Sequence, residues 1–460
     1  MKNKNILKVF GTMLLVTFVL TWVVPSTTIE SSELTVGVTA PTGFADIFTS
    51  IDVLLVYFMK PTILMLFIGM FYGVINKSGS YKSLVDEIIS IFKEHRTIFL
   101  GLTVLFYAVT TAFTGIYLPM FMFMPLSISI LLGLKYGKMQ TLLATFGSVV
   151  IGITAEISNY VLKSITASET NTFFWIKLGL LILMVALEIL FVIRTSSKKD
   201  KKVEINENTI MFVPEKRDAK KEKKTKGISL FVVLILLFAT FVLGLTVWKD
   251  NTMFANLYTS IQNIKIGEFA IFDAILGEFE TFGEWTYTSL YPTLSLAIIV
   301  VAILGKLSFS ETIEGAVNGA KKIMGLAIFA ALINLVVVFT LNSGFVATII
   351  NVIAKSGNVA LITLSSLISS PFMVESAYAS QYLMQLIYNI SSNDAMLELY
   401  GLIVQFAYGF TMLIAPSSIL LMVGLCYLEE KYTKWIKYVW KFVLAILVLC
   451  LIAITVATLI

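Results

Sequence analysis

The sequence has little charge and few of the residues that build catalytic or metal centres. Of its 460 residues, 14% are charged and one is a histidine, His95, whereas roughly 25% of the residues in soluble domains are charged. The two cysteines, Cys426 and Cys450, lie in apolar sequence and provide neither a disulfide framework nor metal-ligand spacing. The acids are scattered, and no nucleotide-binding segment is found. These features argue against an enzyme and predict no catalytic residues, no metal centre and no cofactor.

What the chain has in abundance is apolar sequence. Hydrophobic residues make up 57% of it, more than a water-soluble core requires, which predicts an all-α polytopic membrane protein with the lipid bilayer as its surroundings. The net charge of +5 lies in segments that flank apolar runs, so it does not indicate nucleic-acid binding. About ten to twelve hydrophobic segments are expected, at roughly 6–25, 56–76, 97–113, 117–134, 140–155, 173–193, 227–248, 289–305, 323–341, 358–374, 400–425 and 438–460.

The distribution of Lys and Arg predicts orientation and domain organisation. The segment 194–226 is strongly basic and is expected to be a largely disordered cytoplasmic linker. It separates an N-terminal transmembrane half, 1–193, from a C-terminal half, 227–460. The N-terminus is also expected in the cytoplasm, as a retained first helix rather than a cleaved signal. The protein should therefore be a multi-pass component of the plasma (inner) membrane.

Three amphipathic stretches and two glycine pairs support further, less specific predictions about helix placement and packing. Residues 81–95, 256–280 and 308–322 are expected to be interfacial helices. The pair Gly69–Gly73 lies in an apolar span and fits close helix packing. The pair Gly315–Gly319 lies in charged sequence, where the same spacing means little.

Four regions interrupt the apolar sequence with hydroxyls and with Gly or Pro, two in each half. They are 110–119, 147–159, 363–376 and 405–418. A single break is as well explained by a kink in an ordinary helix. Two breaks in each half favour a duplicated architecture in which the broken helices meet at a solute site. The residues predicted to bind substrate or ion are Thr111, Thr114, Gly115, Glu156, Asn159, Ser370, Glu375, Ser376, Gln405, Gly409, Thr411, Ser417 and Ser418.

Helix ends at such breaks offer unpaired N–H groups that favour a carboxylate, and free carbonyls that can hold Na⁺. Three carboxyl groups are also expected within the membrane, on Glu156, Glu188 and Glu375. A charge there costs about 2.5 to 3.5 kcal/mol on insertion scales. We interpret these carboxyls as proton carriers or as partners of a cationic solute. The alternatives are that Glu156 and Glu375 reach the membrane interface and that Glu188 makes one buried hydrogen bond.

Several of these segments resemble the YfcC-like branch of the anaerobic C4-dicarboxylate carriers, in the ion transporter superfamily. The segments LTWVVP (20–25), GMFYGVINKSGSYKSLV (69–85), SFSETIEGAVNGAKKIMGLA (308–327) and KYTKWIKYV (431–439) are similar to family segments. The most specific match is QFAYGFTMLIAPSSILLM (405–422), which keeps Gln405, Phe406, Gly409, Phe410, Thr411, Pro416 and Ser418 of the family pattern. The resemblance implies a scaffold domain, a transport domain with two re-entrant hairpins, inverted repeats and a homodimer.

The chain also departs from the family pattern. Met412 replaces an Asn, Ala407 and Tyr408 replace Gly-Asp, and Tyr160 replaces the Pro after Asn159. The function predicted is secondary active transport of a small carboxylate-bearing solute, a C4-dicarboxylate or an amino acid. It would be coupled to Na⁺ or H⁺ or run by exchange. The alternatives are a membrane-embedded enzyme, a channel or a degenerate family member that no longer transports.

Overall fold

The computed structural model describes residues 4–30, 33–57, 59–158, 171–196, 205–206, 209–215, 227–248, 252–267, 269–270, 280–390 and 396–460. It is an all-α polytopic membrane protein, as predicted. Within these residues, 8 helices are long and apolar enough to cross a membrane. The predicted segments at 117–134, 140–155, 358–374 and 400–425 are shorter or interrupted helices instead.

The N-terminal half begins with a helix and a small antiparallel hairpin, and its other described elements are helices. Its elements are α1 (Lys4–Val23), β1 (Thr27–Glu30), β2 (Glu33–Val36), α2 (Phe44–Tyr57), α3 (Met59–Ser78), α4 (Ser80–Phe92), α5 (Arg96–Thr114), η1 (Leu118–Met122), α6 (Met124–Gly133), α7 (Lys138–Leu142), the π-helix η2 (Leu143–Gly147), α8 (Ser148–Thr154) and α10 (Phe174–Thr195).

The C-terminal half is built in the same way, with a second short hairpin near its start. Its elements are α11 (Gly227–Leu245), α12 (Thr252–Gln262), β3 (Lys265–Ile266), β4 (Phe269–Ala270), η4 (Tyr287–Ser289), α14 (Leu290–Leu304), α15 (Phe309–Ile333), α16 (Leu335–Ser343), α17 (Phe345–Ala354), α18 (Val359–Ser369), η5 (Ser370–Phe372), α19 (Ser376–Ile390), α20 (Leu397–Met412), α21 (Ile419–Tyr427) and α22 (Tyr432–Ala457).

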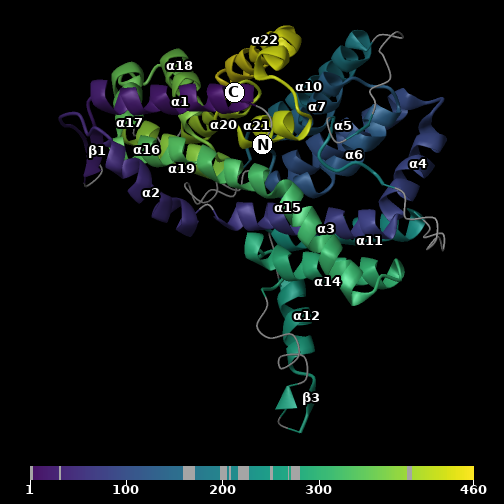
Figure 1. The fold of residues 1–460 in the computed structure, drawn as a ribbon. Helices are drawn as coiled ribbons and strands as arrows, with labels where there is room; N and C mark the ends of the chain where they lie inside the picture. Colours follow the sequence, from purple (N-terminus) through teal and green to yellow (C-terminus); the bar gives the residue numbers. More distant parts are fainter. Residues whose placement is uncertain are drawn as a thin grey trace.

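One order of elements occurs in both halves. A long helix (α3, or α15 with α16) leads to a short helix (α4 or α17) and a helical hairpin (α5–α6 or α18–α19). An interrupted helix (α7–α8 or α20–α21) and a long final helix (α10 or α22) follow. In Figure 1, α4 to α7 gather on the right of the view and α16 to α19 on the left, with α3 and α15 between them. This order of elements agrees with the predicted two repeats with broken helices and hairpins. That the hairpins are re-entrant stays a prediction.

The two repeats meet where α3 and α15 cross. A Cβ atom placed on Gly73 would lie 2.0 Å from the carbonyl oxygen of Gly315. One placed on Gly319 would lie 2.0 Å from the carbonyl oxygen of Gly69. Because no Cβ fits, the two backbones are in direct contact, as in other small-residue helix crossings. The expectation that the Gly315–Gly319 spacing means little is therefore wrong.

The stretch 308–322 is not a separate interfacial helix either. It forms the first half of α15, which runs without interruption from Phe309 to Ile333. The helix opens with a capping box, in which the Ser308 hydroxyl accepts from the Glu311 N–H at 3.2 Å and the Glu311 carboxylate accepts from the Ser308 N–H at 2.9 Å. The charged residues of this segment favour a surface helix, but its opposite face, with Gly315 and Gly319, is buried against α3.

Part of the basic linker is packed against the helices. Phe212 is 1% exposed, and its ring stacks on Tyr72 with the centroids 5.2 Å apart. The side-chain amide of Asn76 donates to the Val213 carbonyl at 2.9 Å and accepts from the Glu215 N–H at 3.2 Å. The expectation of a largely disordered linker is therefore wrong for residues 209–215.

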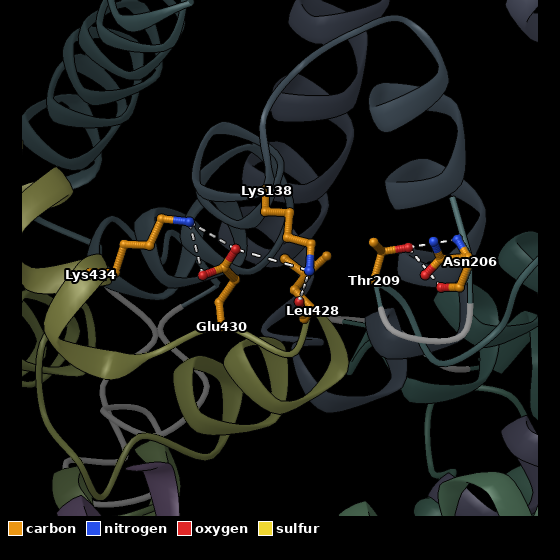
Figure 2. A network of polar contacts seen from close by, with 6 residues as sticks. All are labelled: Lys138, Asn206, Thr209, Leu428, Glu430 and Lys434. Atoms are coloured by element: carbon orange, nitrogen blue, oxygen red, sulfur yellow. Dashed lines mark hydrogen bonds and ion pairs between the residues drawn. The ribbon is translucent and has the colours of Figure 1, made fainter. Parts of the chain in front are cut away.

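The interrupted helices of the two halves are also joined at one end. Figure 2 shows Lys138, the first residue of α7, pointing toward Leu428 and Glu430 of the other half. Its ammonium group donates to the Leu428 carbonyl at 2.6 Å and lies 4.0 Å from the Glu430 carboxylate, which also pairs with Lys434 at 2.9 Å. This contact fixes the start of one interrupted helix against the end of the other.

Candidate functional site

The tip of the first hairpin is shaped by threonines. Helix α5 ends at Thr114, and Gly115 follows with φ of 71°. The Thr111 hydroxyl donates to the Ile116 carbonyl at 3.0 Å, and the Thr114 hydroxyl accepts from the Ile116 N–H at 3.1 Å. Side-chain hydroxyls thus replace the helical hydrogen bonds that the turn interrupts, as a break in a membrane helix requires.

The first broken helix lies directly against this tip. After α8 ends at Thr154, the Ile157 N–H donates to the Ala112 carbonyl at 2.6 Å. The Glu156 carboxylate accepts a hydrogen bond from the Ser158 hydroxyl. It lies over the tip, since a Cβ on Gly115 would be 3.4 Å from its Oε1 atom. The break therefore presents a carboxylate beside the hairpin turn.

Helix α20 of the other half supports the same break. The Gln405 side-chain amide donates to the carbonyls of Thr154 and Glu156, at 3.0 Å each. One helical turn further on, Gly409 lies against Thr154, where a Cβ would come within 2.5 Å of the Thr154 Cα. The carbonyls freed by the break are thus satisfied by one side chain from the second repeat.

The second hairpin reaches the site through Glu375, which lies between η5 and α19. Its backbone is held by Tyr408, whose hydroxyl donates to the neighbouring Val374 carbonyl at 2.9 Å. Its carboxyl group interacts electrostatically with Tyr117 of the first hairpin tip and with Tyr287, and all three side chains border one cavity. Two hairpins and one broken helix, from both halves, thus come together at one place.

A cavity of about 520 Å³ opens at this junction. This volume lies within the range of small-molecule sites. Besides the hairpin tip, the first break and Glu375, its walls include the end of α11 and the segment before α14. The lining residues are Phe113, Thr114, Gly115, Ile116, Tyr117, Pro119, Glu156, Ser158, Leu245, Thr246, Val247, Gly283, Glu284, Trp285, Thr286, Tyr287 and Glu375.

The predicted site residues fall into two groups around this cavity. Thr114, Gly115, Glu156 and Glu375 line it directly. Behind the wall, Thr111 holds the hairpin tip while Gln405 and Gly409 of α20 contact the first break.

Other predicted residues lie away from the cavity. Ser370 donates to the Ser366 carbonyl at 2.6 Å, and Ser417 donates to the Pro371 carbonyl. Ser418 caps α21 by accepting from the Leu421 N–H at 3.4 Å, and Thr411 is buried on α20. Asn159 and the side chain of Ser376 lie outside the described residues.

The second break, 413–418, is closed by the last helix. The Trp435 indole donates to the Leu413 carbonyl at 2.9 Å, and the Tyr432 hydroxyl donates to the Ile414 carbonyl. Gly409, which the sequence places in the interruption, lies within α20, so the break begins later than predicted. The freed carbonyls of this break thus accept hydrogen bonds from side chains of α22.

Sequence reasoning missed a buried lysine close to the site. Lys177, in the first turn of α10, is 2% exposed and interacts electrostatically with Glu156 and Glu398. A lysine in a membrane segment costs as much as the carboxylates that were singled out. The same criterion, applied to basic residues, would have identified it. The cavity aromatics Trp285 and Tyr287 gave no comparable signal in the sequence.

Glu188 lies elsewhere, in the packing of α10 on the first interrupted helix. It is fully buried, and its Oε1 atom accepts from the Ser148 hydroxyl at 2.9 Å. Its second oxygen has no hydrogen-bond partner among the described residues. A role in transport for this carboxyl stays a prediction.

Comparisons with known proteins bear on this arrangement. A family model described as the C4-dicarboxylate anaerobic carrier, DcuC, matches residues 4–459. No curated protein matches the chain. Among solved structures, the chain is similar to the YdaH transporter of Alcanivorax borkumensis, at 12% identity over 98% of both chains. The TM-score of that superposition is 0.40.

Proposed function

Because this chain belongs to the C4-dicarboxylate anaerobic carrier family, as its 405–422 segment indicates, we propose that it is a secondary active transporter that binds its solute in the cavity described above. The solute is a small molecule that bears a carboxylate, a C4-dicarboxylate or an amino acid. Transport is driven by a Na⁺ or H⁺ gradient or by exchange for a second solute.

The observation that carries the proposal is the convergence of hairpin tips and a broken helix on one cavity. Thr114 and Gly115 come from the first hairpin, Glu156 from the first break and Glu375 from the second hairpin. Interrupted helices at membrane depth are tolerated where they line a cavity, and they mark solute sites in secondary transporters. We assign solute binding to these four residues, and the roles of the remaining predicted residues stay predictions.

The proposal also covers the membrane location, the orientation and the oligomeric state of the protein. We place the protein in the plasma membrane, with the N-terminus and the 194–226 linker in the cytoplasm, because these segments are rich in Lys and Arg. We also propose a homodimer, on the basis of the family resemblance alone.

Solute flux into proteoliposomes tests the proposal. The purified full-length chain is reconstituted, and the uptake of labelled C4-dicarboxylates and amino acids is followed with a Na⁺ gradient, with a pH gradient, and with unlabelled solute inside for exchange. We expect at least one solute to accumulate above protein-free liposomes. If no carboxylate moves under any of the three conditions, the protein is not a carrier of this class. Binding without flux would identify it as a family member that no longer transports.

A further inference from the structure

The charges around the cavity are unusual for a site that is to hold a dianion. Among the described residues that line it, every charged side chain is acidic: Glu156, Glu284 and Glu375. The nearby cation, Lys177, already interacts with Glu156 and Glu398. Because like charges close together repel, a solute that brings two carboxylates and no positive charge is poorly matched to these walls.

The rest of the lining has the features of a cation site. Phe113, Tyr117, Trp285 and Tyr287 all border the cavity. The negative faces of aromatic rings attract ammonium groups, most strongly when water is excluded. Trp285 is held in place, because its indole donates to the Glu280 carbonyl at 2.8 Å and its ring packs where a Cβ on Gly244 would be.

One carboxylate in the exposed part of the wall can accept hydrogen bonds from such a group. Glu284, an exposed residue, accepts one bond from the Thr281 hydroxyl at 2.8 Å and, as a carboxylate, has further acceptor capacity. An ammonium group carries three donors and no acceptor, so it can donate a hydrogen bond to the Glu284 carboxylate.

We propose that the cavity recognises an ammonium group, so that the solute is an amino acid of zero or positive net charge rather than a bare dicarboxylate. The inference rests on the proposed transport function and names the solute class for the same site. The ammonium group lies among the aromatic rings, Glu284 and Glu375. The single carboxylate lies toward Thr114 and Gly115 at the first hairpin tip.

Solute pairs that differ by an ammonium group test this assignment. Uptake into proteoliposomes, or the concentration that half-saturates thermal stabilisation of the full-length protein, is compared for lysine, alanine, aspartate, propionate and succinate. We expect lysine and alanine to bind at least tenfold more tightly than propionate, and aspartate more tightly than succinate. If succinate is transported and no amino acid competes with it, the inference is overturned while the proposed function stands. If none of the five solutes nor any other carboxylate binds or moves, the proposed function itself fails.

Variants of the wall separate recognition from folding. Glu284→Gln removes one charge from an exposed segment, and Trp285→Leu removes one ring. Each variant should weaken the binding of lysine about tenfold without strengthening the binding of propionate. Glu314→Gln is the matched control, since Glu314 pairs with Lys77 at 3.0 Å on the exposed surface of α15. Ligand-free unfolding temperatures verify that each variant folds. Unchanged lysine affinity in both wall variants, with folding intact, would contradict the assignment.

Discussion

The break after α8 and the break after α20 lie in different repeats, and they are completed in different ways. The first leaves Glu156 and Ser158 on a cavity wall, with Lys177 behind. In the second, Trp435 and neighbouring side chains take up the freed carbonyls, and Met412 and Leu413 border a small apolar void. We call them the open break (155–158) and the closed break (413–418).

This difference shows that a break in a membrane helix is not by itself a solute site. Freed backbone groups must be satisfied, and in the closed break side chains of α22 do this. In the open break Gln405 satisfies two carbonyls from behind, which leaves the front of the break accessible to the cavity. The substitution of Met412 for the family's Asn fits the closed break, where the surroundings are apolar.

The largest expected effect comes from the charge behind the open break. Lys177→Met leaves Glu156 and Glu398 without their buried cation, and removing one partner of a buried charge group costs about 3 to 5 kcal/mol. We expect a markedly lower unfolding temperature in detergent and loss of uptake. Lys434→Met is the control, because Lys434 pairs with Glu430 at the exposed surface. A Lys177→Met/Glu156→Gln double variant should recover part of the stability; additive losses would show that the two charges are not coupled.

A second prediction concerns the contact between the repeats at the open break. Gly409→Val places a side chain where Thr154 already lies, with its Oγ1 atom 2.3 Å from the new Cβ. Overpacking of this kind costs about 1 to 3 kcal/mol, and it displaces the break from the hairpin tip. Uptake should fall at least tenfold. Gly179→Val, at a helical position with nothing within 4 Å, should change neither uptake nor stability.

Gln405→Leu tests whether the open break depends on its support from α20. The substitution leaves the carbonyls of Thr154 and Glu156 without their donor, at a cost of about 2 kcal/mol. We expect a raised KM for uptake as well as a lower unfolding temperature. The control is Gln140→Leu, which removes a single bond to the Thr195 carbonyl at 3.1 Å, far from the cavity. An unchanged KM in Gln405→Leu would mean that the break keeps its shape without this side chain.

The smallest effect is expected at the closed break. Ser417→Ala removes one hydrogen bond to the Pro371 carbonyl and costs about 1 kcal/mol. Because this break does not border the cavity, the KM for uptake should stay within twofold of the parent protein. A several-fold rise in KM would show that the closed break contacts the solute, and the distinction between the two breaks would then be lost.

The sequence predicts the positions of the interruptions well, because their causes are local. Thr114-Gly115, Pro371 and Pro416 end helices through their own backbone preferences, and each lies at or next to a break in the structure. The fold class follows from composition, because a chain that is 57% hydrophobic contains more apolar sequence than a water-soluble core requires. What the local sequence cannot reveal is which partner satisfies a freed carbonyl, since Trp435 and Gln405 reach their breaks from other helices.

The cavity was only partly predictable for the same physical reason. Glu156 and Glu375 are conspicuous because a carboxyl in apolar sequence is costly. Trp285 and Tyr287 are ordinary residues in a mixed segment, and only tertiary packing brings them to the first hairpin tip. The Gly315–Gly319 pair was misjudged because its charged neighbours conceal a face that touches Gly69 and Gly73.

That glycine contact has a mechanical consequence. Where α3 and α15 cross at Gly73 and Gly319, backbone lies on backbone, and no side chain separates the two helices at these positions. Such a close contact gives the two helices a pivot at the crossing point. A small tilt there grows into a larger displacement toward the far ends of both helices.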